Sequence, residues 1–137
     1  MHLNEALVRR FYAAREHETA DEVRSLLASD VHWRDPYPSP YGGEFRGVEA
    51  VVGFLFGPLV QEVEGSGLEL DDVVANDRLA IAVVKWWTTI GGETMRGREI
   101  GVYTISAGRI ADVWFVTEDQ AAADAFFARK RPDRADR

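Results

Sequence analysis

VHWRDPYPSPYGGEFRGVEAVVGFLF, residues 31–56, is the stretch of this chain on which the predicted fold depends. It opens with a short apolar alternation that ends at Asp35-Pro36, and a loop with a glycine pair follows. The apolar residues then recur at helical spacing over residues 48–56. Irregular loops held between rigid elements are where functional sites usually lie. We therefore predict that Asp35, at the start of the loop, points into a pocket.

The whole chain has 137 residues, enough for one domain with a core of its own. We predict a single domain over residues 1–128 and a charged, disordered tail over residues 129–137. The net charge of −7 argues against binding to nucleic acid or to an anionic membrane. Without cysteine, disulfides, thiol nucleophiles and thiolate metal sites are excluded. No apolar run reaches membrane-spanning length and no secretion signal is evident, so we expect a cytoplasmic protein.

Helical patterns precede the strand patterns along the chain. Two helices are expected before residue 31, a third over residues 48–56, and a short C-terminal helix around Phe126 and Phe127. From residue 68 the apolar period changes to two, which predicts strands over residues 68–74, 79–89, 94–105 and 109–117. This order is typical of an α+β domain. We predict a strongly curved, cone-shaped antiparallel sheet with the N-terminal helices packed on its concave face.

The hairpin at Gly91-Gly92 predicts which side chains face the inside of this cone. If the glycines form a two-residue loop, Trp86 pairs with Gly97 and Val84 pairs with Glu99. The predicted inner face then holds Ala82, Val84, Trp86, Thr88, Glu99, Gly101 and Tyr103. The predicted outer face holds Val83, Lys85, Trp87, Arg96 and Arg98, which include three cations.

The turn before the last strand decides the orientation of that strand. A three-residue loop with Gly108 left-handed pairs Tyr103 with Ala111, whereas a two-residue turn would reverse the faces. We favour the longer loop, which places Ala111, Val113 and Phe115 inside and Asp112 and Trp114 outside. Trp87 and Trp114 then share an outer face with no helix over it. This face predicts a homodimer interface, although two fortuitous surface tryptophans would give the same pattern.

Four segments of the chain resemble the nuclear transport factor 2 (NTF2) superfamily, which includes ketosteroid isomerases, SnoaL-like cyclases and limonene epoxide hydrolases. They are LVRRFYAAR (7–15), SLLASDVHWRDP (25–36), FRGVEAVVGFL (45–55) and SAGRIADVWF (106–115). The resemblance extends to about residue 128 and implies the cone-shaped α+β fold. It does not specify a reaction, because this fold supports many activities.

The catalytic pattern of ketosteroid isomerases is only partly present. Asp35 matches the place of the general base, but the places of the two oxyanion donors fall on Phe11 and Gly101, which cannot donate from a side chain. SnoaL-like cyclases carry an Asp after a Trp of the last strand, and here Phe115 follows that Trp. Epoxide hydrolases of this fold use an Asp-Arg-Asp cluster, whereas Arg96 and Arg98 are predicted to point outward. None of these three reactions is implied in full.

Three residues are the catalytic candidates. Asp35 could act as a general base or acid, or cap its own loop as an Asx turn. Glu99 could be a second acid–base group or a ligand anchor, or could lie in solvent if the predicted register is wrong. Tyr12 could supply a phenol to the pocket or simply pack in the core. The predicted substrate-binding side chains are Trp33, Phe54, Trp86, Tyr103, Val113 and Phe115, which an ordinary core would explain equally well.

These residues lead to two functional hypotheses. The first is an enzyme that needs no cofactor and acts by proton transfer on a small hydrophobic molecule, as an isomerase, dehydratase, cyclase or hydrolase. The second is a non-catalytic module that binds a small ligand or a protein in the same cone. No spacing of His, Asp and Glu resembles a metal site, and no nucleotide motif is present, so neither a metal nor a cofactor is expected.

Overall fold

The computed structural model describes residues 1–57 and 63–130. Among these residues it contains four helices and six strands. The helices are α1 (Leu3–Glu16), α2 (Ala20–Leu26), α3 (Val48–Leu55) and α5 (Gln120–Arg129). The strands are β1 (Leu27–Asp35), β2 (Gly43–Arg46), β3 (Gly65–Ala75), β4 (Leu79–Ile90), β5 (Glu93–Ser106) and β6 (Arg109–Thr117).

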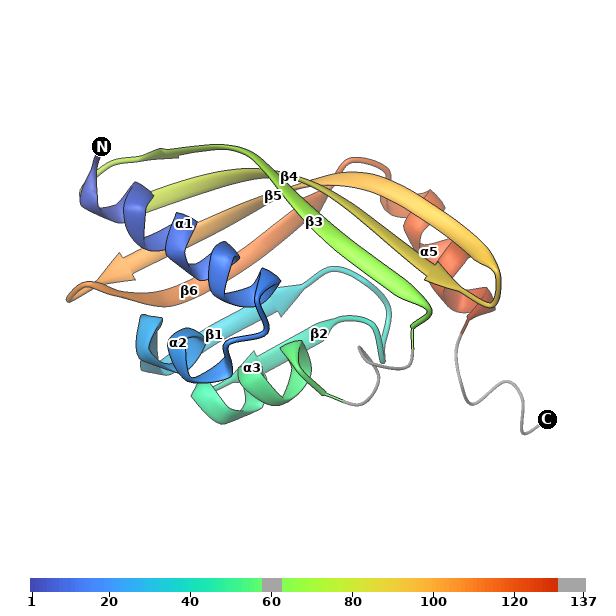
Figure 1. Ribbon diagram of the computed structural model, residues 1–137, viewed down its shortest axis with the longest axis horizontal. Coiled ribbons are helices and arrows are strands. Elements are labelled where there is room, and N and C mark those ends of the chain that lie inside the picture. The colour runs from blue at the N-terminus through green and yellow to red at the C-terminus, as the bar shows by residue number, and fades with distance from the viewer. Residues whose placement is uncertain (58–62, 131–137) are drawn as a thin grey trace.

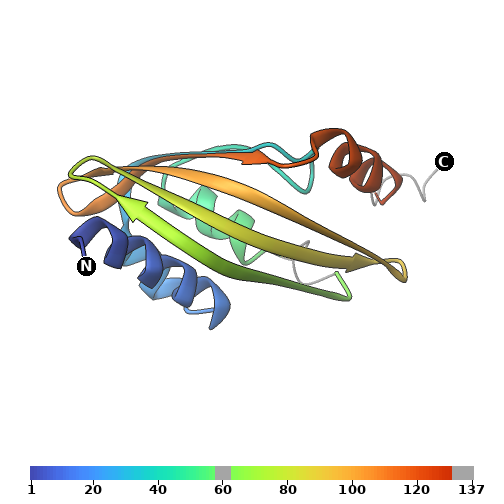
Figure 2. The same cartoon turned by 90° about the horizontal axis from the view of Figure 1, so that it is seen from above.

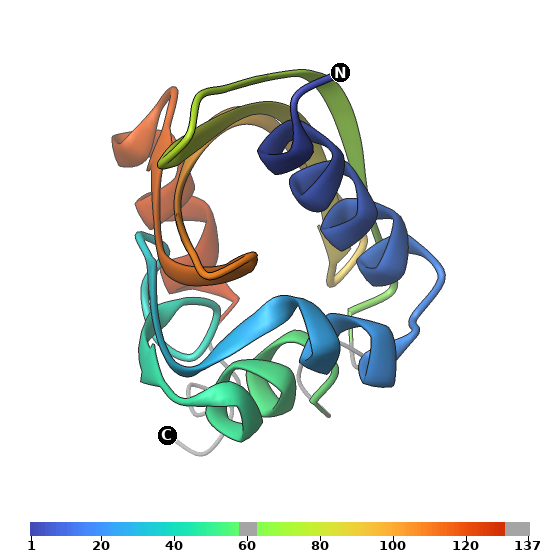
Figure 3. The same cartoon turned by 90° about the vertical axis from the view of Figure 1, so that its left-hand side faces the viewer.

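The six strands form one sheet in the order β2-β1-β6-β5-β4-β3. All neighbouring pairs are antiparallel except β1 and β6, which run parallel. The sheet curls strongly but does not close, as Figure 3 shows, because long twisted strands coil. The predicted fold class is confirmed, with the parallel β1–β6 pair as a feature that the sequence pattern did not reveal.

The N-terminal helices lie on the concave side of this sheet (Figure 1). Helix α1 packs against β3 and β4, and α3 packs against β1 and β2. The apolar stripe of α1 accounts for its position, since Val8 and Phe11 are fully buried. The helix begins at Leu3, directly after its N-cap His2, whose Nδ1 accepts the backbone N–H of Asn4 at 3.0 Å.

Helix α5 lies at the end of the sheet where β4 turns into β5 (Figure 2). Ala123, Phe126 and Phe127 of this helix pack against Trp86. Glu93 holds the end of the helix through ion pairs with Arg129 (2.8 Å) and Lys130 (3.1 Å). These two residues of the predicted tail therefore belong to the helix and its cap, and residues 131–137 lie outside the described residues.

The β4–β5 hairpin has the predicted two-residue turn and register. Ile90 pairs with Glu93, and Val84 pairs with Glu99, so Glu99 faces the concave side. Both turn glycines, Gly91 and Gly92, have positive φ, as a tight turn of this kind requires.

The predicted β5–β6 turn is wrong in its pairing. Ser106 pairs with Arg109 around a two-residue turn, in which Ala107 and Gly108 both have positive φ. A register shift next to Ile105 then inserts one extra residue in β6, so Tyr103 pairs with Val113 rather than with Ala111. The bulge therefore lies inside the strand instead of in the turn. It restores the predicted faces, with Val113 and Phe115 buried and Trp114 exposed.

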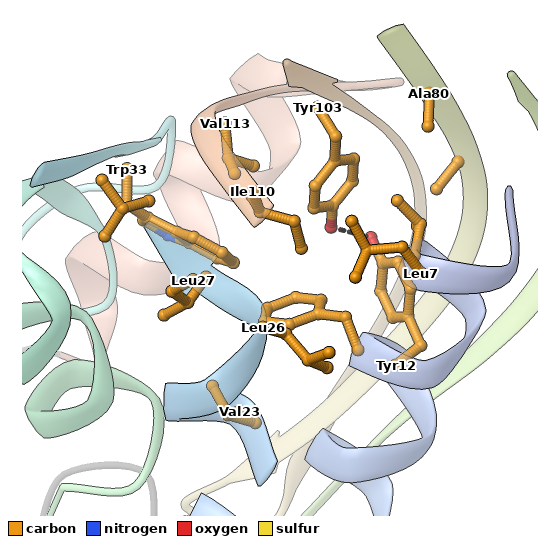
Figure 4. Close-up of a cluster of buried hydrophobic side chains, with 14 of the residues drawn as sticks. Leu7, Tyr12, Val23, Leu26, Leu27, Trp33, Ala80, Tyr103, Ile110 and Val113 are labelled. Atoms are coloured by element: carbon orange, nitrogen blue, oxygen red, sulfur yellow. Dashed lines mark hydrogen bonds between the residues drawn. The ribbon is translucent and has the colours of Figure 1, made fainter. Parts of the chain in front are cut away.

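A cluster of buried hydrophobic side chains lies where α1 packs on the concave side of the sheet (Figure 4). Trp33, Tyr103 and Phe11 are fully buried there. The ring centroid of Phe11 lies 5.8 Å from that of Trp33 and 5.9 Å from that of Tyr103. We refer to this part of the concave side, centred on these three residues and Tyr12, as the closed end. None of the helices within residues 1–57 and 63–130 combines the length and apolar character that a membrane span needs.

Candidate active site

A cavity of about 1350 Å³ opens on the concave side beyond the closed end. Its wall comes from α1, the start of α2, the β1–β2 loop, α3, strands β3, β4, β5 and β6, and α5. Six of the predicted site residues line it: Tyr12, Asp35, Phe54, Trp86, Glu99 and Phe115. The size is sufficient for a small organic molecule.

The other three predicted ligand contacts are corrected by the structure. Trp33, Tyr103 and Val113 have no exposed surface and lie in the core behind the cavity wall. The alternation of side chains along each strand correctly predicts that these residues point inward. It does not predict how deeply each side chain is buried. Helix α1 covers the closed end, so inward-facing side chains there contact the helix rather than a ligand.

Asp35 ends β1 and is partly buried in the cavity wall. Its Oδ1 accepts the backbone N–H of Tyr37 at 3.4 Å, a long hydrogen bond. Burial, followed by the negative charge of Glu99, raises the pKa of Asp35 to about 7. The carboxyl is therefore near half-ionised at neutral pH, as a group that accepts and returns a proton requires.

Glu99 faces Asp35 from β5 and is 8% exposed. Its Oε1 accepts the hydroxyl of Tyr37 at 2.8 Å. Burial raises the pKa of Glu99, whereas the Tyr37 hydrogen bond and the charge of Arg15 act in the opposite direction. A buried carboxyl with one hydrogen-bond donor is under-satisfied by the protein alone.

Tyr37 connects the two acids, because its backbone N–H reaches Asp35 and its hydroxyl reaches Glu99. Its ring packs against Trp86 at 5.3 Å and against Phe127 at 5.4 Å between ring centroids. Gly42 lies so close that an added Cβ would be 2.2 Å from the backbone oxygen of Tyr37. Sequence reasoning missed Tyr37, since nothing in a loop sequence specifies how the loop folds back.

Tyr12 lies between the closed end and the cavity. Its hydroxyl accepts a hydrogen bond of 2.5 Å from the hydroxyl of Tyr103, drawn as a dashed line in Figure 4. Burial raises the pKa of both phenols, so they remain protonated at neutral pH. The Tyr12 hydroxyl therefore remains as one donor at this boundary, and the pair carries no charge.

Arg15 is the second residue that sequence reasoning missed. Its guanidinium lies over the rings of Phe11, Tyr12 and Trp33, 5.7 to 5.8 Å from each centroid. It also lines the cavity. The helical spacing from Phe11 to Arg15 could have identified it, because residues four apart share one face of a helix.

The described part of the chain contains no group of three His, Asp or Glu side chains that could hold a metal ion. The polar side chains of the cavity wall include the carboxyl groups of Asp35 and Glu99, the guanidinium groups of Arg9 and Arg15, and the phenols of Tyr12, Tyr37 and Tyr41. The remaining wall is mainly apolar, with Leu68, Leu70 and Phe54 among its members. Such a site can hold an apolar molecule and exchange a proton with it.

Comparisons with known proteins agree with this architecture. Bal32a from a soil-derived mobile gene cassette has a TM-score of 0.82 and 25% identity, with 90% of this chain and 95% of that chain covered. An NTF2-like protein of unknown function from Burkholderia pseudomallei has a TM-score of 0.77 and 22% identity, with 95% and 98% covered. Both have the fold that the sequence predicted.

Sequence comparison identifies the family. An uncharacterized protein of Mycobacterium tuberculosis is 33% identical over 124 residues, which are 89% of this chain and 94% of that protein. An uncharacterized protein of Mycobacterium bovis has the same identity and coverage. Residues 8–113 match the SnoaL-like domain family. The chain therefore belongs to the SnoaL-like family and has the NTF2-like fold.

Proposed function

We propose that this protein is an enzyme that moves a proton on a small hydrophobic molecule bound in the cavity, without a cofactor. Asp35 takes the proton, and Glu99, with help from Tyr12, acts as the acid or orients the substrate. The observation that carries the proposal is the pair of carboxyl groups, Asp35 and Glu99, in one mainly apolar wall.

The environment of Asp35 suits this role. A pKa of about 7 gives the carboxyl both useful protonation states near neutral pH. The charge of Glu99 contributes to the raised pKa of Asp35, after the larger effect of burial. Isomerisation, dehydration and cyclisation through an enol all begin with the removal of a proton from carbon, which is the step assigned to Asp35.

Deuterium exchange tests this step without knowledge of the natural substrate. We expect the protein in D₂O to accelerate exchange at the α-carbon of hydrophobic ketones such as β-tetralone, followed by mass spectrometry. Asp35→Asn should reduce the exchange rate roughly 10²- to 10⁴-fold. Asp30→Asn is the matched control, because Asp30 lies exposed on the same strand and should leave the rate unchanged.

Two results would contradict the proposal. One is a wild-type exchange rate no higher than that of buffer across a panel of hydrophobic ketones, which would favour a non-catalytic binding module. The other is an Asp35→Asn variant that exchanges as fast as the wild-type protein.

We further propose that a second copy of the chain covers the outer face of the sheet. Four exposed apolar side chains on this face support the idea: Trp87, Ile100, Trp114 and Val116. Ile100 and Val116 are paired across β5 and β6, so the apolar surface is continuous there. Light scattering should give a dimer that Ile100→Glu combined with Val116→Glu converts to a folded monomer; a monomeric wild-type protein at micromolar concentration would refute it.

A further inference from the structure

The guanidinium of Arg15 is a charged group of the cavity wall to which the proposed proton transfer gives no role. Arg15 lies one helical turn after Phe11 on α1, and three aromatic rings cover it. Contact with aromatic rings does not use the N–H groups of a guanidinium as hydrogen-bond donors. The question is what those N–H groups bind.

Arg15 differs from the other partly buried arginines of the described residues in its lack of a carboxylate partner. Arg9, Arg24 and Arg34 each pair with a carboxylate, at 2.9, 2.7 and 2.6 Å respectively. Within residues 1–57 and 63–130, Arg15 has no carboxylate within 4.0 Å of its nitrogens and no hydrogen-bond acceptor for its guanidinium. A partly buried cation without an acceptor is costly unless something completes it.

The charge of Arg15 nevertheless reaches the reacting groups. It acts on Asp35 and Glu99, where it favours the ionised form, without being bound by either. It acts in the same direction on the Tyr12 phenol. Arg15 lines the same cavity as Asp35, Glu99 and Tyr12.

We infer that Arg15 is a catalytic residue, whose guanidinium binds the substrate oxygen on which negative charge develops during the reaction. The inference rests on the proposed function and assigns it a substrate class: hydrophobic molecules with a carbonyl or an acidic hydroxyl. Guanidinium groups bind anionic oxygens through two parallel N–H donors. Arg15 would supply, from the same helix face, the donor that Phe11 cannot provide.

The step balances as a simple enolisation. The Asp35 carboxylate takes the proton from the carbon next to the carbonyl, and the C–H electron pair forms a carbon–carbon double bond. The carbonyl π electrons move to the oxygen, whose negative charge pairs with Arg15, which keeps all its protons. Return of the proton to the same or another carbon reverses the electron flow and completes an exchange or an isomerisation.

Substituted β-naphthols are suitable probes, because they resemble the enol of β-tetralone and their absorption differs between the neutral and ionised forms. We expect the wild-type protein to bind a cyano- or nitro-substituted β-naphthol as the anion at a pH below the solution pKa of that naphthol. Arg15→Gln should weaken binding roughly 10- to 100-fold and leave the bound naphthol neutral. Arg15→Lys, which keeps the charge and the aliphatic stem, should fall between the two.

Arg10→Gln is the matched control. Arg10 lies on the same helix but is exposed and outside the cavity wall, and Glu22 pairs with it at 2.6 Å. This variant should bind the anion as the wild-type protein does. Thermal unfolding of each variant verifies that it is folded before the titration.

The inference is wrong if the wild-type protein binds the naphthols only in the neutral form, or not at all at millimolar concentration. It is also wrong if Arg15→Gln still binds the anion with unchanged affinity. These outcomes are separate from failure of the proposed function: Asp35→Asn should bind the anion at least as well as the wild-type protein, since a negative charge is removed. Ketone exchange without naphthol ionisation would leave Asp35 as the base and remove Arg15 from the mechanism.

Discussion

Two positions on the inner face of β5, Tyr103 and Glu99, lie four residues apart and have opposite environments. At the closed end, Tyr103 is fully buried, packs against Phe11 and donates a hydrogen bond from its hydroxyl to that of Tyr12. Glu99 faces the cavity and accepts one hydrogen bond from a protein side chain, the hydroxyl of Tyr37. The inner face of β5 thus contributes to core packing at the closed end and lines the cavity at the other end. The two environments differ because helix α1 covers the closed end of the sheet.

Removing an aromatic ring from each end should give the largest contrast in stability. Trp33→Ala empties a fully buried site at the closed end, so we expect a loss of about 3–5 kcal/mol in the free energy of unfolding. Phe54→Ala removes a partly exposed ring of the cavity wall that stacks on Phe45 at 4.4 Å. We expect about 1–2 kcal/mol there, because the lost ring already faces open space. Urea unfolding measures both; equal losses would mean that the cavity wall is packed like the core.

Neutralising Asp35 should stabilise the protein in a pH-dependent way. The pKa of Asp35 is raised to about 7 in the folded state from an ordinary value of 3.8. The folded protein therefore holds this proton more tightly than the unfolded chain, and stability falls as the pH rises from the lower to the higher value. Asp35→Asn should escape that loss, with a gain of about 2–4 kcal/mol at about pH 8 that disappears near pH 4.

Unfolding of the wild-type protein and Asp35→Asn across this pH range checks the prediction. Asp30→Asn again serves as the control, since its exposed side chain should show no such dependence. A gain that stays constant with pH would show that packing rather than charge is responsible. A loss of stability at about pH 8 would remove the case for an elevated pKa.

The same contrast explains how far the sequence could predict the structure. Regular elements follow from local patterns: the two-residue Gly91-Gly92 loop sets the register of β4 and β5, and this alone places Glu99 on the inner face. The β6 bulge could not be predicted, because nothing in the sequence near Ile105 separates a bulge in the strand from a longer turn. Depth could not be predicted either, so Trp33 was expected to contact a ligand.

The candidate site divides in the same way. Asp35 and Glu99 were predicted from a strand end and a strand face, which are features of local sequence. Tyr37 lies in a loop whose path depends on close approach to Gly42 and on packing against Phe127 of α5. Phe127 lies 90 residues after Tyr37 in the chain. Long-range contacts of this kind leave no local pattern. Arg15 did leave one, the helical spacing from Phe11.

Adding a methyl group where the two ends meet should cost less than emptying the core. A Cβ on Gly101 would lie 2.8 Å from the Tyr103 ring and 2.9 Å from the Phe115 ring. Both rings must shift, so Gly101→Ala should cost about 1–3 kcal/mol in urea unfolding. Gly53→Ala is a suitable control, because its Cβ would meet nothing within 4 Å and alanine favours a helix. A neutral Gly101→Ala would indicate that the wall yields easily and that the boundary between the two ends is soft.

The smallest and most specific contrast comes from removing one phenol hydroxyl at each end. Tyr103→Phe deletes a hydrogen bond between neutral groups, and we expect a loss of about 1 kcal/mol that does not vary between about pH 5 and pH 8. Tyr37→Phe deletes a donor that favours the ionised form of Glu99, so the pKa of Glu99 should rise further. Its stability loss should therefore be present at high pH, where Glu99 is charged, and disappear as Glu99 is protonated. Carbon-13 NMR of the glutamate carboxyl carbons, with unfolding across pH, tests both; a pH-independent loss in Tyr37→Phe would mean that Tyr37 acts by packing, and that Glu99 does not depend on it for charge.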